Sequence, residues 1–272
     1  MSRYKKITLI SAFVIMIIVA VVAYLQTDRT KQTAHKDYHQ IMESRKLRVI
    51  TDYNSVGYFV MDDTVAGFNH DLLQLFAANA NLELDVKLEN DLQKSIDALN
   101  RGEVDILARN IPANFSLKND VAFTQPIIRN KLVLVQHISE NKDEKPIRSL
   151  LDLAKKTVYV SKASPAKLRL ENLSNEIGDT IFVKEDSLYE STQLIMKVAS
   201  AEIEYVVCDA AIAEKVAKII PNIDIKTDVG FTHLEAWAVS KSSPVLLDSL
   251  NIWIGRLQQS PVFDRIYRKY YK

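Results

Sequence analysis

Polar residues stand where predicted strands end and helices begin, and their chemistry is that of ligand binding. Asp209 follows an apolar strand and precedes a helix from Ala210. A carboxylate near a cleft needs a cationic or donating partner, although Asp209 would serve equally well as the N-cap of that helix. Ser164, before Pro165, has the pattern of an N-cap followed by proline in the first turn. Asp52 closes the first strand, as a ligand contact or as a turn cap.

Catalytic and metal chemistry have less support in the residue pattern. The five histidines, at 35, 39, 70, 137 and 233, show no HExxH motif or other metal-ligand spacing. No nucleophile stands beside a base. The single cysteine, Cys208, excludes an intramolecular disulfide and a zinc site of several thiolates. The sequence therefore predicts a protein that is not an enzyme and holds no cofactor and no metal.

The elements that position these residues alternate between strand and helix. Strands are predicted at 47–50, 84–88, 104–108, 157–160, 181–183, 205–207 and 237–239, with a further apolar run at 127–136. Helices are predicted at 71–80, 92–99, 147–154, 165–173, 187–198, 210–219, 244–257 and 262–271. The helix at 187–198 is placed by a Ser-x-x-Glu capping box that begins at Ser187. This alternation predicts an α/β protein with mostly parallel sheets.

The N-terminal segment predicts export. Residues 7–25 form a run of 19 residues without a charge, preceded by Arg3, Lys5 and Lys6. A helix of that length nearly matches a hydrocarbon core of about 30 Å, and the basic residues keep the N-terminus in the cytoplasm. A cleaved signal peptide is the alternative. Residues 26–46 are predicted to form a polar stalk, with a helix between Lys36 and Arg45.

The charge distribution excludes nucleic acid as a partner. The formal charge is +1, but residues 1–46 carry a local +5 and residues 47–272 a local −4. A mildly acidic globular part lacks the basic face that nucleic-acid binding requires. The basic excess belongs instead to the segment expected at the membrane.

Seven short pieces in a fixed order resemble a known family. They are LRVITD, GFNHDLL, ALNRGEVDIL, AFTQP, VYVSKAS, EYVVCD and FDRIYRKYY. Together, over roughly residues 44–272, they resemble the bacterial extracellular solute-binding proteins of family 3, with the type II periplasmic binding fold. Asn54-Ser55, Tyr58-Phe59 and the Asp209-Ala210 helix look like the sensor domain of membrane-bound lytic murein transglycosylase F. The catalytic domain of that family is not expected here, because the chain ends at Lys272.

The resemblance implies a two-lobed domain over residues 47–272. Lobe 1 would comprise about 47–128 and 236–272, and lobe 2 about 129–235, with crossings near Ile128 and Glu235. The ligand would lie in the cleft between them. There Asp209 would hold a ligand ammonium, and the turn at Ser164 would donate backbone N–H groups to an anionic end. The other ligand contacts predicted in this cleft are Asp52, Ser55, Tyr58 and Asn110.

Two departures from the family pattern concern the ligand. The arginine that grips the carboxylate in amino-acid binders falls on Leu117 here. Arg109 is near enough to substitute, or it ends its strand as a solvated charge. The aromatic that stacks on the ligand is replaced by the stretch at residues 54–59.

The function expected is a membrane-tethered, extracytoplasmic solute-binding or sensing domain that is non-catalytic. Its ligand would be amino-acid-like or a peptide, including a muropeptide. The chain would cross the bacterial inner membrane once, with the globular domain on the periplasmic side. A cell-wall enzyme or an ABC permease would be its protein partner. The alternatives are the receptor of an ABC importer, a ligand-free interaction domain and a dehydratase-like enzyme that uses a cleft acid.

Overall fold

The computed structural model describes residues 16, 35–113, 116–139, 145–162 and 164–272. The membrane anchor predicted at residues 7–25 lies outside these residues, apart from Met16, as does the first part of the predicted stalk. Among the residues that are described, no helix is long and apolar enough to cross a bilayer.

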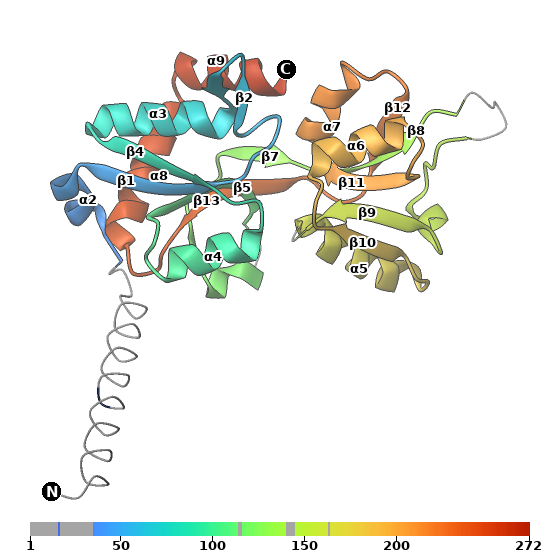
Figure 1. The fold of residues 1–272 in the computed structure, drawn as a ribbon, viewed down its shortest axis with the longest axis horizontal. Coiled ribbons are helices and arrows are strands. Elements are labelled where there is room, and N and C mark those ends of the chain that lie inside the picture. The colour runs from blue at the N-terminus through green and yellow to red at the C-terminus, as the bar shows by residue number, and fades with distance from the viewer. Residues whose placement is uncertain (1–15, 17–34, 114–115, 140–144, 163) are drawn as a thin grey trace, which may run out of the picture.

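The chain forms two lobes, each built around its own β-sheet (Figure 1). In lobe 1 the strand order is β4 (Glu83–Leu88), β1 (Lys46–Thr51), β5 (Ile106–Pro112), β13 (His233–Val239) and β6 (Ala122–Phe123). Strand β1 pairs in parallel with β4 and β5, whereas β13 runs antiparallel to β5 and β6. The lobe 1 sheet is therefore parallel among β4, β1 and β5. It becomes antiparallel at β13, which comes late in the chain and lies between β5 and β6.

Lobe 2 has a five-stranded sheet of similar design. Its order is β10 (Phe182–Asp186), β9 (Thr157–Ser161), β11 (Tyr205–Asp209), β8 (Leu132–His137) and β12 (Ile223–Asp228). Strand β9 is parallel to β10 and β11, and β8 is antiparallel to β11 and β12. In both lobes the sheet is mixed, so the prediction of mostly parallel sheets is wrong: β13 in lobe 1 and β8 in lobe 2 run antiparallel to the strands beside them.

Helices cover both sheets and bury their apolar faces on them. In lobe 1 they are α3 (Phe68–Ala80), α4 (Leu92–Asn100), α8 (Pro244–Gln258) and α9 (Pro261–Tyr271). In lobe 2 they are α5 (Pro165–Ile177), α6 (Ser191–Ala199) and α7 (Ala210–Ala217). A 3-10 turn, η1 (Ser116–Asn119), lies in lobe 1, and another, η2 (Leu150–Leu153), lies in lobe 2. Trp237 is fully buried in lobe 1 and donates from Nε1 to Asn69 Oδ1 at 3.0 Å. That bond joins β13 to the first turn of α3.

Two paired strands carry the chain between the lobes. Strand β7 (Ile128–Asn130) pairs antiparallel with the start of β13, with Asn130 opposite His233 and Ile128 opposite Glu235. Asn130 Nδ2 also donates to Glu235 Oε1 at 3.0 Å. The crossing is thus tied by backbone and side-chain bonds, and both strands border the space between the lobes (Figure 1).

Helix α2 (Tyr38–Ser44) lies inside the segment predicted as a stalk, but it packs on lobe 1 (Figure 1). Its Ile41 is fully buried in the main core. Asp37 caps α2 in a capping box with Gln40, and its Oδ1 accepts from the backbone N–H of Leu246 at 2.7 Å. The last part of the predicted stalk is therefore attached to the domain rather than separate from it.

Helix α6 does not begin where the Ser-x-x-Glu pattern placed it. Its N-cap is Glu190, which forms a capping box with Gln193, so the helix starts at Ser191. The residues after Ser187 instead form a turn in which Asp186 Oδ1 accepts from the backbone N–H groups of residues 188 and 189 at 2.9 and 3.0 Å. The capping box predicted at Ser187 is wrong, because the carboxylate of Asp186, and not the side chain of Ser187, accepts hydrogen bonds from the following backbone N–H groups.

Candidate ligand-binding cleft

A polar cavity lies between the lobes, at the carboxyl ends of strands β1, β9 and β11. Its empty space is about 760 Å³, part of it open to solvent. The polar side chains that line it are Asp52, Asn54, Arg109, Asn110, Asn130, Ser161, Ser164, Glu190, Ser191, Asp209 and Tyr271. A concave, polar site at strand ends and helix N-termini is where α/β proteins of this kind bind small ligands.

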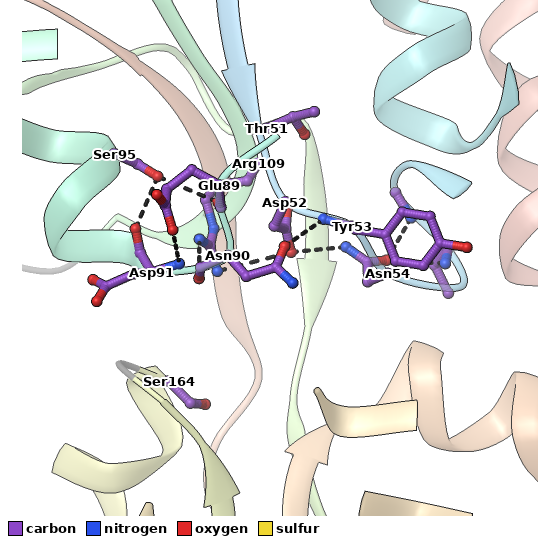
Figure 2. A network of polar contacts seen from close by, with 12 residues as sticks. Thr51, Asp52, Tyr53, Asn54, Glu89, Asn90, Asp91, Ser95, Arg109 and Ser164 are labelled. Carbon is purple, nitrogen blue, oxygen red and sulfur yellow. Dashed lines mark hydrogen bonds and ion pairs between the residues drawn. The ribbon is translucent and has the colours of Figure 1, made fainter. Parts of the chain in front are cut away.

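Asp52 and Arg109 form the wall on lobe 1 (Figure 2). Asp52 Oδ2 accepts from Asn54 Nδ2 at 2.8 Å and lies 3.8 Å from Arg109 Nη2. Arg109 Nη1 donates to the carbonyl of Asn90 at 3.0 Å. The Arg109 side chain is only 13% exposed, so the interpretation of this residue as a solvated charge is wrong. Asp52 Oδ1 is buried and has no hydrogen-bond partner.

Ser164 and Glu190 contribute to the wall on lobe 2. Ser164 is the N-cap of α5 and accepts from the backbone N–H of Ala166 at 3.2 Å, and it faces the lobe 1 network in Figure 2. Burial raises the pKa of the Glu190 carboxyl, and the charge of Asp52 adds to this, while Arg109 opposes it. Both residues stand at helix N-termini, where backbone N–H groups favour negative charge.

Asp209 lines the cavity from the end of strand β11. It occupies the N-cap position of α7, yet its side chain accepts no capping hydrogen bond. Burial raises the pKa of Asp209 to about 8, with the charges of Glu235 and Asp52 adding to the shift. His233 and Arg109 oppose it. A carboxylate in this position gains from any cation that enters the cleft.

His233 and Glu235 lie behind Asp209 on the crossing strand β13. His233 Nε2 is 3.2 Å from Glu235 Oε1, while Glu235 Oε2 is buried with no partner. Burial alone would lower the pKa of His233, but the hydrogen bond to Glu235 and the charges of Glu235 and Asp209 raise it overall. These carboxylates therefore stabilise the protonated imidazole relative to the neutral one.

Tyr271 closes the base of the cavity from α9. Asn110 Nδ2 donates to its hydroxyl oxygen at 2.8 Å. Burial raises the pKa of Tyr271 well above its usual value, with the charge of Glu235 adding to the effect. The hydroxyl therefore stays neutral and is available as a hydrogen-bond donor.

Asp209, His233 and Glu235 are the residues of the described chain that could hold a metal ion. Their ligand atoms all lie within 4.8 Å of one another. One imidazole and two carboxylates would suit zinc or a similar divalent ion. Binding would require the imidazole to lose its proton, against the preference that its carboxylate neighbours impose.

Four of the six ligand contacts predicted from the sequence line the cavity together, namely Asp52, Asn110, Ser164 and Asp209. Ser55 lies in an adjacent groove between the lobes, where its Oγ accepts from Thr192 Oγ1 at 3.3 Å. Tyr58 packs edge-on against the His70 ring, with centroids 5.6 Å apart.

Sequence reasoning missed several lining or supporting residues. Glu190 was taken only as part of a capping box, and Tyr271 only as part of the helix predicted at 262–271. His233 and Glu235 stand two residues apart, so they share one face of a strand. That spacing could have indicated that the two side chains lie together. The strand was predicted to begin only at Trp237, so both residues fell outside it. Leu117, at the position of the family arginine, packs against the apolar cluster of lobe 1.

The lobes also touch beside the cavity. Lys162 Nζ of lobe 2 is 3.2 Å from Asp91 Oδ2 of lobe 1. Lys215 Nζ, on α7, lies 4.2 Å from the centroid of the Phe59 ring in the β2 strand (Phe59–Met61). These contacts hold the two lobes together over the cleft.

Known proteins share both this sequence pattern and this fold. A membrane-bound lytic murein transglycosylase F of Desulfosudis oleivorans is 28% identical over 245 residues, which cover 86% of this chain and 52% of that protein. A solute receptor for L-cysteine of Neisseria gonorrhoeae has a TM-score of 0.75 at 18% identity, covering 86% of this chain and 93% of the receptor. An ancestral arginine-binding protein bound to arginine has a TM-score of 0.73 at 22% identity, covering 83% and 98%.

The chain spans about half the length of the transglycosylases that it matches. The two solved structures establish the two-lobed fold, in agreement with the fold class predicted from the sequence. The model of the family described as "Bacterial extracellular solute-binding proteins, family 3" matches residues 47–272. This chain is therefore a member of the family 3 bacterial extracellular solute-binding proteins.

Proposed function

We propose that this domain binds a small amino-acid-like or peptide ligand between its lobes and acts as a non-catalytic sensor. The observation that supports this most is the carboxylate of Asp209, which lines the cavity without a hydrogen bond from its own helix. A carboxylate whose charged form is disfavoured by burial gains stability when a ligand supplies a cationic partner. The ammonium group of an amino-acid-like ligand would do so.

Ligand binding would favour the closed arrangement of the lobes. The cavity takes residues from both lobes, and the chain crosses between them only through β7 and β13 among the described strands. A ligand that contacts both walls has a differential affinity for the closed state and shifts the population toward it. Lobe closure is then the conformational change that a partner protein recognises.

Sensing at the membrane is supported by the kind of relative that the chain resembles. The transglycosylases that match it are named as membrane-bound and as acting on murein. We therefore place the domain on the periplasmic side of the inner membrane, tethered by residues 7–25, with cell-wall peptides among its ligands. A cell-wall enzyme would be the partner that recognises the closed form of the domain.

A thermal-shift screen tests binding. The compounds are free amino acids, short peptides and muropeptide fragments. A ligand at 100 times its dissociation constant stabilises the folded state by about 2.7 kcal/mol. For a domain of this size, that corresponds to a rise in melting temperature of roughly 5–10 °C. If no compound raises the melting temperature, the proposal is wrong.

Two variants test whether a rise in melting temperature comes from binding in the cleft. Asp209→Asn should abolish the shift with any compound found, because it removes the carboxylate that binds the ammonium. Asp85→Asn is the matched control, since that side chain is half exposed and pairs with Lys46 on the surface. Recovery of the compound unchanged after incubation would support a non-catalytic role. If wild type converts the compound and Asp209→Asn does not, the non-catalytic role is wrong and the domain is an enzyme.

A further inference from the structure

The cavity carries an excess of negative charge. Among its lining residues are three carboxylates, those of Asp52, Glu190 and Asp209, and one cationic side chain, Arg109. Their formal charge is −2, and behind Asp209 the Glu235 carboxylate is paired with His233. Charges taken out of water need counter-charges nearby. The lining is therefore best neutralised by a ligand with two positive charges.

Carboxylates stand on both walls of the cavity. On lobe 2, Asp209 makes no capping hydrogen bond, and on the crossing strand β13, in the lobe 1 sheet, Glu235 Oε2 is buried without a partner. On lobe 1, Asp52 Oδ1 is likewise buried without a partner. Each wall thus presents acceptors that the fold leaves unused. A ligand with a donor group at each end would satisfy both.

Apart from helix N-termini, the cavity offers little to a ligand carboxylate. Arg109 already donates to the carbonyl of Asn90 and lies beside Asp52, and its charge also acts on Glu190. The position that would carry a second guanidinium is Leu117, which packs against the core of lobe 1. An anionic end would therefore meet uncompensated carboxylates.

We propose that the ligand of this cleft is a small organic diamine, or a molecule that presents two ammonium groups and no free carboxylate. One ammonium binds Asp209 and the other binds Asp52, so that the ligand bridges the lobes. This inference rests on the proposed function, since it names the ligand class of the same site. It differs from that proposal by excluding a free α-carboxylate from the recognition.

A single divalent metal ion fits the cavity less well. The cluster whose ligand atoms lie within 4.8 Å of one another contains Asp209, His233 and Glu235 but not Asp52. An ion bound in that cluster would leave Asp52 Oδ1 without a partner. Two separated charges on one chain match both walls.

Titration calorimetry with matched compounds tests the inference. The probes are the α,ω-diamines from 1,3-diaminopropane to 1,6-diaminohexane, in buffer that contains EDTA. Lysine is 1,5-diaminopentane with an added carboxylate, and n-pentylamine is the same chain with one ammonium. One diamine length should bind at least 10-fold more tightly than the monoamine of that length. The 1,5-diamine should also bind more tightly than lysine.

Two variants then test which carboxylate binds each ammonium group of the diamine. Asp52→Asn and Asp209→Asn should each weaken diamine binding at least 10-fold, and Asp52→Asn should also remove the difference between diamine and monoamine. Asp85→Asn should leave both affinities unchanged. Thermal melts of the unliganded variants check that each is folded.

Three outcomes would overturn the inference. If lysine or a neutral amino acid binds and the diamines do not, the ligand class is wrong while solute binding stands. If the diamines bind equally well to Asp52→Asn, the second ammonium site is wrong. If zinc binds in buffer without EDTA and no organic compound does, the cleft is a metal site and the solute-binding proposal also fails.

Discussion

Asp209 should destabilise the unliganded domain at neutral pH, and replacing it with asparagine should remove that cost. Burial, with the charge of Glu235, raises its pKa in the folded domain to about 8, from an ordinary value of about 3.9. The groups that act on this carboxyl are Glu235, His233, Asp52 and Arg109. Because its pKa is raised on folding, the folded state binds the proton more tightly than the unfolded state does.

The sign and size of the effect follow from this difference. Below about pH 4 the carboxyl is protonated in both states and costs nothing. As the pH rises, the unfolded state ionises first, and stability falls by about 1.4 kcal/mol per pH unit until the folded state ionises near pH 8. Between pH 4 and pH 7 the loss amounts to about 4 kcal/mol. Asp209→Asn has no proton to lose and should not show it.

Urea denaturation of wild type and Asp209→Asn between pH 4 and pH 8 measures the effect. The quantity to follow is the difference in unfolding free energy, variant minus wild type, which should increase by about 4 kcal/mol from pH 4 to pH 7. The difference is needed because His233, whose pKa is also raised, adds its own fall in stability as the pH rises. A difference that stays constant with pH would refute the account of Asp209.

Three further predictions concern the framework. Arg48→Ala should cost about 3–5 kcal/mol in urea denaturation, because it leaves the fully buried carboxylate of Asp105 without its ion pair. Gly67→Ala should cost at least about 3 kcal/mol in the same assay, since φ is +140° and the added Cβ would lie 2.2 Å from a backbone oxygen. Lys162→Ala should loosen the lobes but weaken ligand binding by no more than about 1 kcal/mol, because its bridge to Asp91 is half exposed. X-ray scattering would show a larger radius for the unliganded Lys162→Ala variant, and an unchanged radius would contradict the role of this bridge.

The parts of the fold with a strong apolar period were predictable. Helix α4 and strands β1, β4 and β9 lie within one or two residues of their expected bounds, because their side chains repeat at helical or strand spacing. The hairpin of β2 and β3 (Thr64–Ala66) was not predicted. Its turn uses Asp62 and Asp63 at φ of 50° and 59°, a conformation for which Asn-Gly is the usual signal.

The candidate site was predictable only in part, for a physical reason. Asp52, Ser164 and Asp209 stand at strand ends or helix starts, which parallel α/β topology brings to one edge. Glu235 reaches the site from a crossing strand, and Tyr271 reaches it from the last helix. Their positions depend on how distant elements pack, and no local pattern records that packing.

Helix α2 has a consequence for which half of the molecule moves. It lies on the side of lobe 1 that faces away from lobe 2 (Figure 1), and Asp37 is bonded to the first turn of α8. Ser243 Oγ also donates to the carbonyl of Lys36 at 3.0 Å. Lobe 1 is therefore the stationary half relative to the chain that leads into it. In the proposed closure, lobe 2 is then the half that moves relative to this segment, so a partner that detects the ligand would gain most by contacting lobe 2, where a small hinge rotation gives the greatest displacement.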